Sequence, residues 1–444
     1  MPYRAAGDDP PPRPRLRRPA LRAAAPPGGE PRGVGRPGRR HPAADGPGSR
    51  RAARRGRWHR RAGLQGARGR RRRRHRGAPR HVRPQHRGRH QQRRPRRGHD
   101  VRRRGPSARA RPRRGDPAAG GGLAPVRYVV VGAGAVGGGT AALLHEAGHD
   151  VQLVARGSTL AALRSEGLEL EVGDSARTVP VPTLAGLHEA TWDRQSVLVL
   201  AVKSQHTPDL LPALAHVPAH VPVLCLQNSV ANERLLLAHR DPATVHGVVV
   251  MMPASSLRPG SVVLHSLGRP GLLDVGLATG GTDHLDHAVA ADLATAGFDS
   301  VPREDVMAWK RRKLLLNLGN AVDAAYREGP EADALVDRVR REGVAAFATA
   351  GLPVVSEEED RLRRGELLRP LVRRDEAGSS TWQSLERGTG DTEANLLNGE
   401  VVRLGARYAV ATPANAAVLG DVQALAARRG RPRSLDASTV LARL

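Results

Sequence analysis

The sequence predicts an α/β protein in which a sheet domain is followed by a mostly helical domain. Three observations carry this prediction. Short runs of β-branched residues alternate with helical patterns from residue 126 onward, and a G-x-G-x-x-G turn directly follows the first of these runs. From about Asp283 onward, helical patterns bracketed by Gly and Pro dominate. Strands that alternate with helices form parallel sheets, so we expect a Rossmann-type domain first.

The glycine turn is the most informative stretch. A valine-rich strand is expected over residues 128–131, and a helix ending near Gly148 follows the turn. In the motif Gly132-Ala133-Gly134-Ala135-Val136-Gly137, the first glycine permits a tight turn and the second lets backbone approach a pyrophosphate. The third lets the helix pack closely on the strand. The helix N-terminus then offers free N–H groups to phosphates. The motif indicates dinucleotide binding.

The chain after the glycine turn continues to alternate strand and helix patterns. Further helix is expected over residues 159–165, and a short hairpin over 168–172 and 179–181. The remaining strands are expected over residues 151–155, 196–202, 221–226, 248–251 and 261–265. We place a Rossmann domain at residues 126–300 and a helical substrate domain at 301–444.

Residues 1–125 have a different composition. They hold 39 arginines and six acidic residues, whereas the rest of the chain holds 33 basic and 37 acidic residues, so the net charge of +29 comes from this segment. It carries too little apolar surface to form a core and is expected to be disordered. Three interpretations stay open: an arginine-rich arm for nucleic acid, a solvated tail, or a coding start placed too far upstream. The absence of lysine favours the last, with a native start at Val126.

Composition also excludes several classes of protein. Cys225 is the only cysteine, so no intramolecular disulfide forms. No signal peptide and no apolar stretch of spanning length are present, so we expect a cytoplasmic protein that does not enter a membrane. Histidines after residue 125 show no metal-ligand spacing with Cys225, and no metal is expected. His206 is interpreted as an ordinary loop residue, and residues 357–360 as a solvated acidic run at a helix start.

The end of the second strand indicates which cofactor binds. A carboxylate that binds the ribose is expected about 20 residues after the glycine motif, but Arg156 stands there. A carboxylate would repel a 2′-phosphate, whereas an arginine pairs with it. Arg156 therefore favours NADP over NAD.

Lysine is nearly absent, with only Lys203, Lys310 and Lys313 against 69 arginines. Lysines that remain are candidates for chemistry that arginine cannot perform, because a lysine can release a proton near neutral pH. Lys313, Asn317 and Asn320 recur at helical spacing and share one face beside four leucines. Burial there would lower the lysine pKa toward the range of a general acid, although a polar face that satisfies buried backbone has the same pattern.

From Val126 to about Ala416 the chain resembles the ketopantoate reductase (2-dehydropantoate 2-reductase) family. The matching segments are the glycine turn, a Val-Lys pair, a Gln-Asn pair, the lysine helix and a C-terminal block, at residues 132–138, 202–203, 227–228, 313–320, 379–384, 392–400 and 412–415. The resemblance implies reduction of 2-dehydropantoate to pantoate by NADPH, a step of pantothenate and coenzyme A synthesis.

The resemblance also implies residue roles. Lys313 would be the general acid and Glu393 would orient the substrate hydroxyl and the lysine, next to the cofactor. Asn228 would lie near nicotinamide and substrate, and Lys203 would line the cofactor cleft. Ser380 and Asn317 would hold the substrate, together with Asn320.

Two departures leave the substrate open. The family's second helix asparagine usually falls eight residues after the lysine, at Ala321, and Ser229 stands where the family normally has Gly. The alternatives are a reductase of another branched 2-oxo acid, or a non-catalytic NADP-binding regulator whose basic arm contacts nucleic acid. The sequence gives no indication of oligomeric state, and a homodimer formed through the helical domain is compatible with it.

Overall fold

The computed structural model describes residues 125–173, 175–365, 368–370, 378–388, 390 and 392–444. The expected disordered segment therefore lies outside the described residues except for Pro125. No helix in the described part of the chain is long and apolar enough to cross a bilayer.

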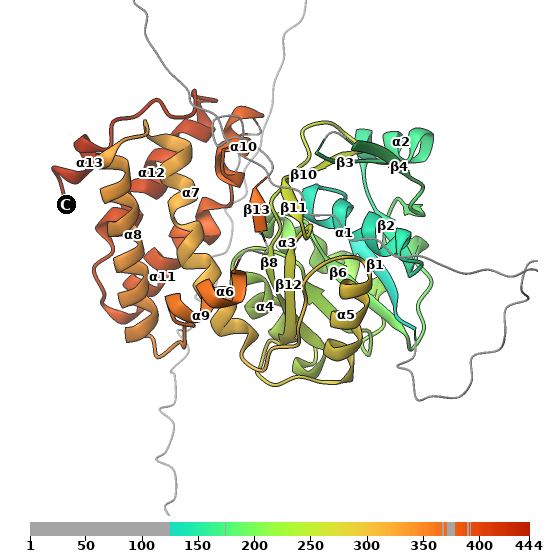
Figure 1. Ribbon diagram of the computed structural model, residues 1–444. Coiled ribbons are helices and arrows are strands. Elements are labelled where there is room, and N and C mark those ends of the chain that lie inside the picture. The colour runs from blue at the N-terminus through green and yellow to red at the C-terminus, as the bar shows by residue number, and fades with distance from the viewer. Residues whose placement is uncertain (1–124, 174, 366–367, 371–377, 389, 391) are drawn as a thin grey trace, which may run out of the picture. The chain divides into compact units, whose positions relative to one another are not determined.

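A seven-stranded sheet forms the centre of the first domain, in the order β12-β8-β7-β6-β1-β2-β5 (Figure 1). All neighbouring strands in it are parallel except β12, which pairs antiparallel with β8. Its strands are β1 (Arg127–Val131), β2 (Asp150–Val154), β5 (Thr183–Leu184), β6 (Ser196–Leu200), β7 (Val223–Cys225), β8 (Val245–Met251) and β12 (Leu272–Leu277). The predicted α/β class is confirmed, although β12 was missed.

A smaller sheet has the order β4-β3-β10-β9, and β11 pairs with β13. These strands are β3 (Leu168–Val172), β4 (Ser175–Val179), β9 (Ala254–Ser255), β10 (Ser261–Leu264), β11 (Ser266–Gly268) and β13 (Leu368–Pro370). The expected hairpin exists, but its second strand covers residues 175–179 rather than 179–181, because four of its five residues are exposed and show no alternation. The strand expected at 261–265 belongs to this sheet and not to the larger one.

Helices surround the large sheet and then form the second domain. The first group is α1 (Ala135–Glu146), α2 (Gly157–Glu166), α3 (Thr207–Leu210), α4 (Ala231–Leu237) and α5 (His284–Thr295). The second group is α6 (Val306–Asn317), α7 (Gly319–Ala325), α8 (Pro330–Thr349), α9 (Glu357–Arg364), α10 (Ser380–Glu386), α11 (Asn398–Tyr408), α12 (Pro413–Ala427) and α13 (Ser438–Leu441). α8, α11 and α12 pack side by side around one apolar core, while α1 and α5 cover a face of the sheet over another (Figure 1). A boundary near residue 300 stays a prediction.

α9 begins with the acidic run and corrects one interpretation. Ser356 forms a capping box with Glu359, which satisfies N–H groups at the helix start. Glu357, Glu358 and Glu359 are exposed, as a solvated run requires. Asp360, however, is fully buried and accepts two hydrogen bonds from Arg364, one turn later. The solvated interpretation is wrong for Asp360, because the fourth position turns toward the core.

Lys310 joins α6 to the large sheet. Its Nζ lies 3.0 Å from Glu233 Oε1 on α4 and donates to the carbonyl oxygens of Gln227 at 2.7 Å and Val248 at 2.8 Å. Both charged side chains are almost fully buried, with 3% and 1% of their surface exposed. Four oxygens surround the ammonium, the fourth being the Cys225 carbonyl oxygen at 3.4 Å, so the compact lysine head with its three N–H donors fits where a planar guanidinium would not.

Replacing Lys310 by Met should lower the free energy of unfolding by about 3–5 kcal/mol, because it leaves the Glu233 carboxylate buried without its partner. Urea denaturation measures this loss. The double variant Lys310→Met/Glu233→Met should recover much of it. Arg258→Met, which breaks an exposed pair with Glu169, serves as control and should cost about 1 kcal/mol or less. Equal losses at Lys310 and Arg258 would contradict the buried-pair interpretation.

Candidate active site

The glycine turn after β1 is packed against the end of β6. Gly132 has φ of 113°, and a Cβ on it would lie 2.8 Å from the Ala201 carbonyl carbon. A Cβ on Gly137 would lie only 2.1 Å from the Gly132 carbonyl oxygen and 2.6 Å from Ala201 Cβ. Both positions therefore exclude any side chain, as a tight turn and a close helix-to-strand contact require.

Gly134 is different. A Cβ built on it meets no atom of the described residues within 4 Å, so the space over this residue is open to a ligand. Gly134 is the N-cap of α1, whose first turn holds no acidic residue and has no side-chain cap. Ala133 precedes it, and Ala135 and Val136 form the first helical positions with small or apolar side chains. The residues present fit the pyrophosphate of a dinucleotide at a helix N-terminus.

Arg156 is exposed just beyond the carboxyl end of β2. It follows β2, which lies next to β1 in the sheet, and it is the N-cap of α2. The carboxyl ends of neighbouring parallel strands meet at one edge of a sheet, so Arg156 and the glycine turn share that edge. The only carboxylate nearby in the sequence, Asp150, pairs with Arg127 at the other end of the strand.

The loops after β6 and β7 reach the same edge. Lys203 follows β6, and its Nζ donates to the Ser384 hydroxyl of α10 at 2.9 Å. Asn228 follows β7, and its carbonyl oxygen accepts from the Ser204 hydroxyl at 2.8 Å and from the Asn232 amide at 2.9 Å. These bonds tie the two loops together and hold the Asn228 backbone in place.

Helix α6 brings a second amide to Asn228. Asn317 Nδ2 donates to Asn228 Oδ1 at 3.3 Å, and Lys313 lies one turn earlier on the same face of α6. α6 ends at Asn317, and Asn320 belongs to α7, where its carbonyl oxygen accepts from the Ser379 hydroxyl at 3.0 Å. The expected single helix is therefore interrupted at Leu318, whose carbonyl oxygen accepts from Asn398.

Lys313 is partly buried, and this changes its acidity. Its pKa is lowered from 10.5 to about 8, mainly by desolvation and also by the Arg364 charge, while the Asp360 charge opposes the shift. Both charged neighbours come from α9. Sequence patterns did not single them out, because neither residue shares a periodicity with Lys313. The capping box before Asp360 was the one available signal.

Glu393 and Ser380 lie near the Lys203 loop. Glu393 begins a 3₁₀ turn (Glu393–Leu396), and its Oε1 accepts from the Ser204 backbone N–H at 3.1 Å. Ser380 is exposed in the first turn of α10, and its carbonyl oxygen accepts from Ser384. The expected contact of Glu393 with Lys313 stays a prediction.

Ser229 occupies a backbone conformation that favours glycine. Its φ is 73°, and its hydroxyl accepts from the Ala231 N–H at 3.1 Å at the start of α4. A left-handed non-glycine residue costs about 1–2 kcal/mol. Ser229 therefore keeps the turn that a glycine would form here, at the cost of some strain beside Asn228.

The glycine cradle, the polar loops and a lysine of lowered pKa define the class of the protein as an oxidoreductase that uses a nicotinamide dinucleotide. The family model described as ketopantoate reductase PanE/ApbA matches residues 128–278, and its C-terminal counterpart matches residues 305–426. The chain belongs to the ketopantoate reductase family, whose members act on 2-oxo acids.

Individual relatives agree with this assignment. The chain is 25% identical to the 2-dehydropantoate 2-reductase of Pyrococcus abyssi over 318 residues, which cover 69% of this chain and 100% of the relative. It is 29% identical to that of Archaeoglobus fulgidus over 305 residues, covering 67% of this chain and 97% of the relative. Among solved structures, a PanE/ApbA family ketopantoate reductase from Ralstonia eutropha JMP134 is similar with a TM-score of 0.58 and 27% identity, covering 68% of this chain and 99% of that structure.

The two helix-side glycines should respond differently to a single methyl group. Gly134→Ala should leave the melting temperature unchanged, because its Cβ meets open space, but should weaken dinucleotide binding at least about tenfold by entering the pyrophosphate site. Gly137→Ala should instead lower the melting temperature, because its Cβ would clash with backbone. Thermal unfolding and cofactor titration distinguish the two effects. Unchanged cofactor affinity in Gly134→Ala would contradict the placement of the pyrophosphate at this turn.

Proposed function

We propose that this protein reduces 2-dehydropantoate to pantoate with NADPH, a step of pantothenate and coenzyme A synthesis, with Lys313 as the general acid. The observation that carries the proposal is the hydrogen bond between Asn317 and Asn228. It holds the face of α6 that bears Lys313 against the loop at the carboxyl end of β7, the edge where open α/β sheets bind ligands. The names of the relatives support the substrate.

Lys313 has the properties that this reaction needs. The bound nicotinamide would supply a hydride to the carbonyl carbon, and negative charge then grows on the carbonyl oxygen. A cationic N–H donor beside that oxygen stabilises the charge and completes the reaction by donating a proton. With a pKa of about 8, Lys313 stays mostly protonated at pH 7 but releases its proton far more readily than an exposed lysine.

The surrounding polar residues would position the two ligands. Asn228 belongs to the loop after β7, and its side chain contacts Asn317 of α6. It would contact both nicotinamide and substrate, while Asn317 and Ser380 would bind the substrate. Lys203, from the loop after β6, would line the cofactor cleft, and Glu393 would orient the substrate hydroxyl from the same side. Asn320 would take part only through α7, since its carbonyl oxygen is engaged by Ser379.

Arg156 supports NADP over NAD. Its guanidinium is exposed at the end of β2, at the position where a ribose-binding carboxylate would otherwise stand. A guanidinium pairs with a 2′-phosphate through two parallel N–H···O bonds.

Two alternatives share the same fold. A different branched 2-oxo acid would use the same lysine, and the family departures lie next to Asn228, at Ser229, and on α7, at Asn320, rather than at the glycine turn. A non-catalytic regulator would have no use for a desolvated lysine on the face of α6 that bears Asn317, so the lowered pKa of Lys313 favours catalysis.

Oxidation of NADPH by the full chain on addition of 2-dehydropantoate tests the reaction directly. Lys313→Ala should lower kcat/KM at least about 100-fold, the usual contribution of a general acid. Tight NADPH binding without turnover on any branched 2-oxo acid would favour the regulator instead.

The same assay gives the pH dependence. A general acid must hold its proton, so kcat/KM for reduction should fall as pH rises through about 8. Arg364→Gln removes a repelling charge and should move this fall to higher pH, whereas Asp360→Asn should move it to lower pH. If neither variant moves the pH profile, then Lys313 is not the group whose deprotonation causes the fall in kcat/KM.

Arg156→Ala should weaken NADPH binding at least about tenfold while leaving NADH binding within about twofold, because only NADPH carries the 2′-phosphate. Fluorescence titration of both cofactors measures the two constants. Arg164→Ala, which removes a second exposed arginine from α2, is the matched control. Equal losses for both cofactors would contradict the phosphate contact.

A further inference from the structure

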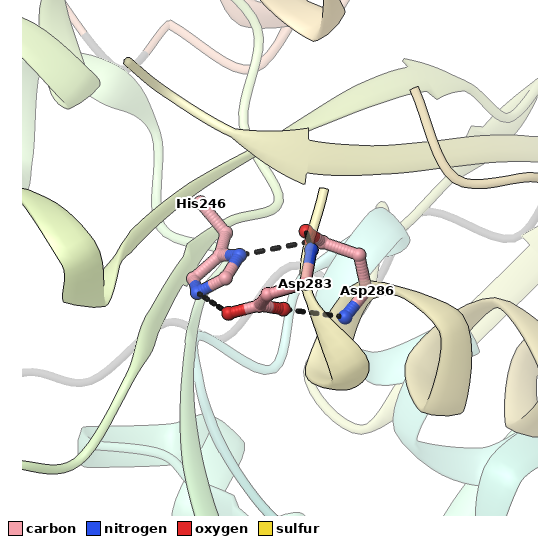
Figure 2. Close-up of side chains that lie close together, drawn as sticks. All are labelled: His246, Asp283 and Asp286. Atoms are coloured by element: carbon pink, nitrogen blue, oxygen red, sulfur yellow. Dashed lines mark hydrogen bonds and ion pairs between the residues drawn. The ribbon is translucent and has the colours of Figure 1, made fainter. Parts of the chain in front are cut away.

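A buried histidine and two aspartates form a cluster that the reductase chemistry does not use. His246 lies in β8, while Asp283 and Asp286 lie at the start of α5 (Figure 2). In the sheet order, β7 and β6 separate β8 from the β1 strand that leads to the glycine turn. His246 and Asp286 have no exposed surface, whereas the Asp283 side chain is 41% exposed. The cluster shares no residue with the candidate active site.

The capping box of α5 fixes both carboxylates. Asp283 Oδ1 accepts from the Asp286 N–H at 3.0 Å, and Asp286 Oδ2 accepts from the Asp283 N–H at 3.0 Å. One oxygen of each carboxylate stays outside the capping box. Figure 2 shows that both of these oxygens are directed toward the imidazole of His246.

The two imidazole nitrogens are in different situations. Nδ1 lies 2.9 Å from Asp286 Oδ1, and an ionised carboxylate only accepts, so Nδ1 is the donor. In the neutral ring Nε2 then carries the lone pair. Nε2 is buried and has no hydrogen-bond partner among the residues that the structure describes, and it faces Asp283 Oδ2 at 3.9 Å. That distance is too long for a hydrogen bond.

A metal ion accounts for this arrangement. Two ligand atoms about 2.0–2.2 Å from one Zn²⁺ ion lie about 3.4 Å apart at the tetrahedral angle. His246 Nε2 and Asp283 Oδ2 are 3.9 Å apart, so a shift of about half an ångström in the half-exposed Asp283 side chain would bring them to that spacing. The half-exposed Asp283 leaves a solvent side on which waters would complete the coordination. A carboxylate that accepts from the far nitrogen of a metal-binding histidine is the usual means of holding the ring in place, and Asp286 has that position.

Charge also favours a cation. Within the described part of the chain, no arginine or lysine pairs with Asp283 or Asp286, and His246 is their only ion-pair partner. The α5 N-terminus compensates part of the two negative charges through the capping box. A divalent ion would neutralise the rest, and one imidazole with carboxylate and water suits first-row transition metals such as Zn²⁺ and Co²⁺.

We propose that His246 and Asp283 bind one divalent transition-metal ion, with Asp286 orienting the imidazole, and that this ion links β8 to the start of α5. Metal ligation was not expected from the sequence, because the two ligands stand 37 positions apart and follow no ligand spacing. The site is structural and independent of the reductase activity.

Zinc titration of the full chain, after treatment with a chelator and dialysis, tests the site by calorimetry. His246→Asn is the first variant, because its amide keeps a donor to Asp286 and removes Nε2. Asp283→Ser is the second, because serine keeps an N-cap and removes the carboxylate. The matched controls are His284→Ala and His287→Ala, which remove exposed histidines of the same helix start.

Wild type and both controls should bind one more equivalent of Zn²⁺ than His246→Asn and Asp283→Ser, and Zn²⁺ should raise their melting temperature. Co²⁺ in wild type should give d–d absorption bands that the two site variants lack. If His246→Asn fails to fold, Asp283→Ser decides. Equal zinc stoichiometry in wild type and Asp283→Ser would overturn the site and leave an ion pair that caps α5. NADPH oxidation should be the same with and without Zn²⁺, so failure here leaves the proposed function standing.

Discussion

The buried ion pair between Lys310 and Glu233 determines where the candidate active site forms. Lys310 belongs to α6, and the oxygens around its Nζ belong to α4 and to the chain at β7 and β8. One of these oxygens is the Gln227 carbonyl, directly before Asn228. Seven residues, or about two helical turns, after Lys310, Asn317 on α6 contacts the Asn228 side chain. The ion pair thus fixes the register between α6 and the strand end, and Lys313 lies between the two contacts.

The Lys310–Glu233 ion pair fixes the position of Lys313, and helix α9 influences its pKa. Arg363 of α9 forms two hydrogen bonds with the buried Asp274 of β12, at 2.7 and 3.0 Å, and an ion pair with Asp299 at 2.6 Å. These bonds tether α9 to the antiparallel edge of the sheet. One residue further, Arg364 acts on the pKa of Lys313, and Asp360 acts on it from the preceding turn. The acidity of Lys313 therefore depends on how α9 packs, although α9 contributes no residue to the family motifs.

Sequence reasoning found the elements whose signals are local. The glycine turn, the parallel strands and the residues at the strand ends were predictable, because spacing and periodicity determine them. β12 was missed because its buried Asp274 breaks an apolar run, and its partner Arg363 stands 89 positions away. The same limit applies to Asp360, since a single acidic residue in a charged run does not reveal which side of a helix faces the core. The break at Leu318 also left no pattern, because Leu318 itself has helical φ and ψ and a distant amide satisfies its carbonyl.

The three lysines show how far a compositional argument can reach. Arginine carries nearly all positive charge in this chain, so each lysine stands where a compact ammonium serves better than a guanidinium. Lys310 donates to backbone carbonyls in a space with almost no solvent, which is a packing reason and not a chemical one. Lys313 has a lowered pKa, which arginine could not provide at neutral pH. The scarcity of lysine thus points to positions where the side chain is strongly constrained. Only the surroundings of each ammonium distinguish Lys310, which is structural, from Lys313, the candidate general acid.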